Sequence, residues 1–199
     1  MRTQPSRKDE SNFKQPIRDK KALQKIEKML LEQERYLELC MFSIGCTSAL
    51  RSHELVSLKV QTILDKKPGD PIRNGKAGHK RQGLLSLSPK AHKCLRLYFE
   101  ARPEVKEGEW LFPGHRKGSH ISTKFLSDHV KEWAKAVGLS PDDYACHSLR
   151  KSFGFHKRQA GVSESLLRKA FGHKDIKSLD SYLGVTDSEV AEVMAEDYF

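Results

Sequence analysis

The chain has 199 residues, 37% of them hydrophobic and 31% charged, which is enough for one well-packed domain and too little for two ordinary ones. Its formal net charge of +10 favours a nucleic acid as partner, with a merely cationic surface as the simpler alternative. No apolar run approaches the roughly 20 residues of a membrane span, and the polar N-terminus lacks the apolar segment of a secretory signal. We therefore expect a cytoplasmic, nucleoid-associated protein without membrane contact.

The cysteine pattern gives no sign of disulfides or of a metal site. Four cysteines, at positions 40, 46, 94 and 146, form no Cys-x-x-Cys pair and no regular disulfide spacing. A zinc site built from Cys146, His147 and other histidines does not match the ligand spacing of structural zinc sites. We expect reduced thiols, no metal and no cofactor.

The N-terminal part is predicted to be a flexible arm followed by two helices. Residues 1–19 mix basic, polar and proline residues, as loosely held arms do. Apolar side chains recur at helical spacing over residues 22–30 and predict an amphipathic helix that ends near Glu32. Residues 36–50 are nearly all apolar or small, and a run of this length favours a buried helix over a strand.

Arg51 directly follows that apolar run, with Glu54 one helical turn further on. Burying a guanidinium without a partner is costly, so the two side chains are expected to interact. Two interpretations fit the sequence: a purely structural ion pair, or an arginine that Glu54 orients toward a ligand.

A small sheet with basic loops is predicted in the middle of the chain. Short strands are expected at residues 60–64 and 84–87, separated by turns rich in glycine and proline. Between Lys66 and Arg96 the sequence has nine lysine or arginine residues against Asp70 alone. This segment is therefore suited to binding an anion.

Two helices are predicted after the sheet. Ser88 followed by Pro89 is a typical helix start, with serine at the N-cap and proline at the first helical position, and this helix is expected to end before Pro103. An apolar stripe over residues 125–137 predicts the next helix, which Gly138 ends.

The C-terminal third carries polar residues suited to phosphate chemistry. His147 and Arg150 lie three positions apart at the start of a helix predicted to run to about residue 160, where the helix N-terminus favours a phosphate. His173 and Tyr182 follow. A phenol has a pKa near 10, so only about one in a thousand is ionised at pH 7, and a tyrosine nucleophile needs imidazole and guanidinium neighbours. Taken singly, each of these residues has a simpler structural explanation.

Together and in this order, these residues resemble the tyrosine recombinases of the phage integrase family, over about residues 16–182. Four segments carry the resemblance, and they read TSALRSHEL at 47–55, GKAGHK at 75–80, HSLRK at 147–151, and FGH at 171–173 with Tyr182 nine positions after the histidine. The sequence departs from the family pattern at Ser48-Ala49, where glycine is usual, and at Lys151, which replaces a frequent histidine.

The resemblance implies a role for each residue. Tyr182 would attack a scissile DNA phosphate and leave a 3′-phosphotyrosyl bond with a free 5′-hydroxyl, while His147 relieves it of its proton. Arg51, supported by Glu54, would clamp the phosphate oxygens. The remaining implied catalytic residues are Arg150 as the second clamp, His173 as a phosphate hydrogen-bond donor, and Lys76, or Lys80 on the same loop, as the acid for the 5′-oxygen. The residues predicted to contact DNA are Lys66, Lys67, Arg73, Lys80, Arg81 and Lys151.

The resemblance also implies a fold and an assembly. We expect an α+β domain over residues 20–185, mostly helical with a small antiparallel three-stranded sheet, as in the family's catalytic domain. Family members generally carry a separate core-binding domain, which is not expected here. A separate DNA-binding partner or neighbouring protomers would therefore contribute further contacts to double-stranded DNA. The acidic segment 186–199 is predicted to form a helix that either docks on an adjacent protomer of a cyclic tetramer on DNA or folds back on its own core. In free solution a monomer is expected.

Two other functions remain open from the sequence. One is a non-catalytic DNA-binding accessory protein of the same fold, and the other is DNA relaxation of the type IB topoisomerase kind. The target site, and whether the outcome is integration, excision, inversion or resolution, does not follow from the sequence.

Overall fold

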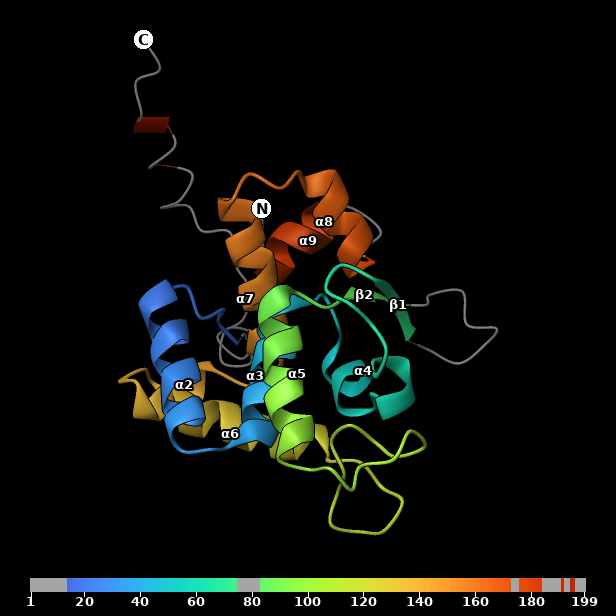
Figure 1. Ribbon diagram of the computed structural model, residues 1–199. Coiled ribbons are helices and arrows are strands. Elements are labelled where there is room, and N and C mark those ends of the chain that lie inside the picture. The colour runs from blue at the N-terminus through green and yellow to red at the C-terminus, as the bar shows by residue number, and fades with distance from the viewer. Residues whose placement is uncertain (1–13, 75–82, 173–175, 184–190, 192–193, 196–199) are drawn as a thin grey trace.

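The computed structural model of the protein describes residues 14–74, 83–172, 176–183, 191 and 194–195 (Figure 1). The elements in chain order are α2 (Lys20–Glu32), α3 (Tyr36–Thr47), α4 (Ser52–Val56), the 3-10 turn η1 (Val60–Thr62), β1 (Pro71–Asn74), β2 (Gly83–Ser86), α5 (Pro89–Glu100), α6 (Thr123–Ala136), the 3-10 turn η2 (Pro141–Asp143), α7 (Cys146–Gln159), α8 (Glu164–Phe171) and α9 (Ile176–Leu183). The prediction of a mostly helical domain is confirmed. None of the helices in this described part has the length and apolar character needed to cross a membrane.

Serine caps fix where several helices begin. Ser88 accepts a hydrogen bond from the Ala91 N–H at the start of α5, which also has proline at its first position, as the sequence predicts. Ser163 does the same for α8 by accepting from the Leu166 N–H. These short-range signals explain why the predicted helix boundaries agree with the structure to within a few residues.

Helix α3 lies at the centre of the main hydrophobic core. Its buried residues run from Leu39 through Gly45 without a polar face, and it contacts α2, α5 and α7. Phe42 packs edge-on against Trp133 of α6, with ring centroids 5.7 Å apart. The predicted buried helix is therefore confirmed. It ends at Thr47, and Arg51 follows as the N-cap residue of α4.

A second, smaller core joins α7, α8 and α9. Its buried side chains are Leu167, Phe171, Leu179 and Leu183. Helix α7 takes part in both cores, and Figure 1 shows α8 and α9 grouped beside one end of it, away from α2 and α6. The close approach depends on Gly154, because a Cβ atom there would lie 2.4 Å from a methyl carbon of Leu183.

The sheet differs from the prediction. Within the described residues it has two strands rather than three, and β1 and β2 pair antiparallel with Ile72 opposite Leu85. The predicted strand at 60–64 is wrong, since its first residues form η1. Val60 and Ile63 are both buried, and this three-residue spacing fits a helical turn rather than the alternation of a strand.

The last residues of the predicted flexible N-terminal arm also differ from the prediction. Residues 14–19 are attached to the domain, because the Ile17 N–H donates to the Ser152 hydroxyl at 2.8 Å and the Ile17 carbonyl contacts the His156 ring at 2.9 Å. The buried Ile17 side chain supplies the apolar anchor that the basic composition concealed. The remainder of the arm, 1–13, lies outside the described residues.

Candidate active site

Arg51 lies at the start of α4 and is held there by Glu54. One Glu54 oxygen accepts from the Arg51 backbone N–H at 2.7 Å, while the other lies 3.4 Å from the guanidinium. The Arg51 side chain nevertheless remains 36% exposed, against 17% for Glu54. The pair is therefore structural, and it leaves the guanidinium partly exposed; that Glu54 orients Arg51 toward a ligand stays a prediction. The Arg51 Nη2 lies beside the end of α8, 3.9 Å from the position that a Cβ atom would take at Gly172.

Arg150 is buried within α7 and links three parts of the fold. Its guanidinium donates to the carbonyl of Ala49, in the connection between α3 and α4, and to the carbonyl of Phe171 at 2.8 Å. Only 4% of its surface is exposed. Its Cζ lies 4.5 Å from the centroid of the Phe171 ring and 5.7 Å from that of Tyr182. The same guanidinium thus contacts the candidate nucleophile and fixes the two segments that flank it.

Tyr182 lies on α9 with its ring against Phe171, at a centroid distance of 5.8 Å. Burial raises the pKa of its phenol, and the positive charges of Arg150 and Arg51, together with a hydrogen bond to Arg150, oppose that rise. The phenol is therefore protonated at neutral pH. It becomes a nucleophile only if its proton is accepted as it reacts, with both guanidiniums close enough to stabilise the negative charge.

His147 lies one turn before Lys151 on α7, and its Nδ1 is 3.3 Å from the hydroxyl of Ser52. Partial desolvation of the ring lowers the pKa of His147, and the positive charges of Lys151, Arg150 and His53 lower it further. The imidazole is consequently neutral at pH 7 and able to accept a proton.

The structure brings together four of the six predicted catalytic side chains: Arg51, His147, Arg150 and Tyr182. The other two, Lys76 and His173, lie outside the described residues, as do the predicted DNA contacts Lys80 and Arg81.

The described DNA-contact candidates differ in exposure. Lys67 is exposed and Lys66 half-buried in the turn before β1, where the Lys67 N–H donates to Asp70. Arg73 belongs to β1, whose backbone is described. Lys151 is only 5% exposed and is packed inside the domain, and its contact with DNA stays a prediction.

Sequence reasoning missed two parts of the site. Helix α4 was not expected, and with it the role of the buried Ser52, which touches His147. The signal was present, since Ser52 lies between Arg51 and Glu54 in the first motif. The burial of Lys151 left no such local signal.

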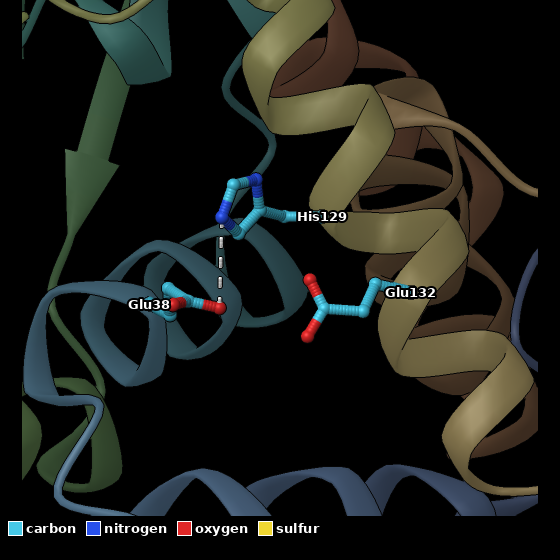
Figure 2. A group of neighbouring side chains, drawn as sticks. All are labelled: Glu38, His129 and Glu132. Carbon is cyan, nitrogen blue, oxygen red and sulfur yellow. Dashed lines mark ion pairs between the residues drawn. The ribbon is translucent and has the colours of Figure 1, made fainter.

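One cluster resembles a metal site but is occupied by a protein cation. Figure 2 shows Glu38 of α3 facing His129 and Glu132 of α6, with the His129 Nε2 3.9 Å from a Glu38 oxygen. Arg35 lies 2.5 Å from Glu38 and 2.7 Å from Glu132, and the Trp133 N–H also donates to Glu38. The guanidinium forms ion pairs with both carboxylates, so the cluster acts as a cross-link between two helices.

Similar solved structures share this fold. XerA recombinase has a TM-score of 0.71 at 16% identity, over 92% of this chain and 67% of that chain. XerH site-specific recombinase, bound to a palindromic difH substrate in a post-cleavage complex, has a TM-score of 0.72 at 20% identity, over 89% of this chain and 51% of that one. At these identities the likeness concerns the fold.

Sequence relatives extend the comparison. The chain is 26% identical over 160 residues to the tyrosine recombinase XerD of Caulobacter vibrioides, covering 78% of this chain and 52% of XerD, so it spans about half the length of that relative. It is 28% identical over 175 residues to the probable integrase/recombinase YoeC of Bacillus subtilis, covering 87% of this chain and 91% of YoeC. The model of the phage integrase family matches residues 17–189. Together with the geometry of Arg51, His147, Arg150 and Tyr182, this match shows that the chain belongs to the phage integrase family.

Proposed function

We propose that the protein is a site-specific DNA recombinase that cuts and rejoins DNA through a 3′-phosphotyrosyl intermediate. The observation that carries this proposal is that Arg51 and Arg150 both act on the phenol of Tyr182, while His147 lies close to Arg150 on the same helix. A neutral imidazole can take the phenolic proton, and the two guanidiniums supply positive charge where negative charge builds on the phosphate.

In the proposed cleavage step, the Tyr182 oxygen forms a bond to phosphorus while the bond from phosphorus to the 5′-oxygen breaks. The phenolic proton passes to His147, and the leaving 5′-oxygen takes a proton from Lys76 or Lys80, with His173 hydrogen-bonding the phosphate. Because one phosphate ester replaces another, rejoining to a new 5′-hydroxyl needs no ATP. Two guanidiniums provide the charge stabilisation that a metal gives in other phosphoryl-transfer sites, so we propose chemistry without a metal or cofactor.

The proposed substrate is double-stranded DNA, bound mainly through phosphate contacts from the basic segment 66–96. The relatives support this proposal, since one is named a tyrosine recombinase and one solved structure holds a DNA substrate. Each phosphate contact should add roughly −0.9 to the slope of log affinity against log salt. We further propose assembly as a cyclic tetramer on DNA, aided by the segment 186–199 or by a separate DNA-binding partner, in the cytoplasm on the nucleoid.

The experiment is to incubate the protein with DNA fragments of its source genome and to look for covalent adducts on denaturing gels. The wild-type protein and a Tyr36→Phe control should form adducts, whereas Tyr182→Phe should bind DNA equally well and form none. Adduct formation by Tyr182→Phe would remove Tyr182 from its role. No adduct with any DNA would favour a non-catalytic DNA-binding protein, and relaxation of supercoiled plasmid without site preference would favour a topoisomerase-like activity.

A further inference from the structure

Lys151 is a buried cation at the candidate active site that the chemistry above does not use. It is only 5% exposed, although lysine is among the residues least often buried. It follows Arg150 directly on α7 and lies one turn after His147, so the Lys151 and His147 side chains are neighbours on the helix surface. A charge removed from water in this way is costly, and the arrangement therefore requires a compensating contact.

The ring of Tyr182 provides such a contact. The Lys151 Nζ lies 5.2 Å from the centroid of that ring, within the range of a cation–π interaction. The Arg150 guanidinium lies 5.7 Å from the same centroid, and the Phe171 ring packs against it as well. Two cations and one aromatic ring therefore restrict how α9 can present its phenol.

The charge of Lys151 also acts on His147. It is the first of the neighbouring charges that lower the pKa of His147, after desolvation. Burial lowers the pKa of Lys151 itself to about 8, so the amine is still mostly protonated over the lower pH range in which His147 titrates. The other charged or titratable groups at the site are Arg51, His53 and Glu54 at the start of α4, Cys146 and Arg150 on α7 and Tyr182 on α9.

We propose that Lys151 is a positioning residue of the active site, whose buried ammonium orients the Tyr182 ring and places a positive charge beside His147. This role rests on the proposed recombinase function. Because the ammonium repels an added proton, His147 stays neutral and available to accept the proton of Tyr182. Lysine suits the task at this position better than histidine, since a histidine is largely uncharged near pH 7.5.

The first test needs no DNA. The titration of His147 is followed by NMR of its imidazole, assigned with His147→Gln, in the wild type, Lys151→Met and Lys151→Arg. Lys151→Met keeps the shape of the side chain without its charge and should raise the pKa of His147 by about one unit. Lys151→Arg keeps the charge and should leave the titration near that of the wild type. An unchanged titration in Lys151→Met would overturn the proposal.

Lys157 offers a matched control on the same helix. Its Nζ lies 5.9 Å from the centroid of the Phe153 ring, but the residue is exposed. Lys157→Met should therefore leave the titration of His147 unchanged, and an equal shift in Lys157→Met and Lys151→Met would contradict a specific role for Lys151. If Lys151→Met does not fold, the wild-type amine can be titrated by NMR after reductive methylation. A midpoint near 8 is expected, and a midpoint near the usual ~10.4 would overturn the buried placement.

The second test uses the reaction. With saturating DNA, the rate of adduct formation by Lys151→Met should fall on the acid limb of the pH profile. The fall should reach about tenfold at a pH well below the pKa of His147, and the limb should move upward by the same amount as that pKa. The affinity for DNA and its salt slope should not change. A reduced salt slope with an unmoved pH profile would instead make Lys151 a phosphate contact and overturn the proposal. Absence of adduct in the wild type would refute the recombinase function, while the titration without DNA would still decide the position of the charge.

Discussion

Replacing Arg150 with lysine should destabilise the fold as well as the chemistry. The arginine guanidinium donates to the carbonyls of Ala49 and Phe171 at once, and so joins α7 to the α3–α4 connection and to the end of α8. A lysine ammonium is a compact point charge and lacks the planar fork that spans both acceptors. One buried carbonyl is then left without a donor, at a cost of about 1–3 kcal/mol.

We therefore expect Arg150→Lys to lower the free energy of unfolding by about 2 kcal/mol. For a chain of this size that corresponds to a Tm about 4–8 °C lower. Urea unfolding followed by circular dichroism at 222 nm measures the first quantity, and a thermal scan measures the second. Under the proposed function the same variant should also form adducts far more slowly, because it loses one of the two proposed phosphate clamps, at a cost of about 3–4 kcal/mol of barrier.

Arg158→Lys is the matched control for this prediction. Arg158 lies on the same helix but is partly exposed, and its ion pair with Glu164 has a separation of 3.8 Å. A pair of this kind contributes about 1 kcal/mol or less, so the control should remain close to the wild type. If Arg150→Lys were as stable as Arg158→Lys, the structural role assigned to the Arg150 guanidinium would be refuted.

Three further predictions follow from the packing and the titratable groups. Gly154→Ala should lower the free energy of unfolding, measured in urea, by about 1–2 kcal/mol, because the new methyl group would clash with the Leu183 side chain, although alanine has a better helix propensity than glycine. An unchanged or higher free energy of unfolding would contradict this packing. The free energy of unfolding should fall as the pH drops from 7 to 5, because His147 and His156 both have lowered pKa values and the unfolded chain binds more protons in that window. The double variant His147→Gln with His156→Gln should show a flatter dependence of this free energy on pH, and an equally steep dependence would contradict the prediction. Burial raises the pKa of the Cys40 thiol, so iodoacetamide should modify it slowly at pH 7.5 and rapidly in urea, as peptide mass spectrometry would show; rapid modification of Cys40 in the native protein would contradict its burial.

Helix positions could be predicted well because their signals are local. Ser88 with Pro89, and Ser163, specify helix starts through hydrogen bonds that span three residues. The continuous apolar run that became α3 needed no knowledge of distant partners to be recognised as buried. The predicted strand at 60–64 failed for the opposite reason. Over so short a length its apolar residues fit both the alternation of a strand and the spacing of a helix, and packing in the folded domain favours the helical turn.

The order of the site residues could be predicted, but their contacts could not. The spacing of Arg51, His147, Arg150 and Tyr182 suggested convergence, whereas the bonds from Arg150 to two carbonyls depend on how α7 and α8 pack. The burial of Lys151 likewise depends on α9.

Charge counts along the chain are similarly incomplete. Lys90 belongs to the basic segment, yet it pairs at 2.6 Å with Glu27 of α2, 63 positions earlier. Arg96 pairs with Glu100 beyond the end of that segment. The positive charge offered to DNA by this region is therefore smaller than the sequence count of nine against one indicates.

The central claim is that the Tyr182 oxygen becomes joined to DNA. Trypsin releases residues 178–199 as a single peptide that contains Tyr182 and Tyr198, because the chain has no lysine or arginine after position 177. After adduct formation and nuclease digestion, fragment-ion mass spectrometry of this peptide should place a nucleotide on Tyr182. A nucleotide on Tyr198, or on a residue outside this peptide, would contradict the account.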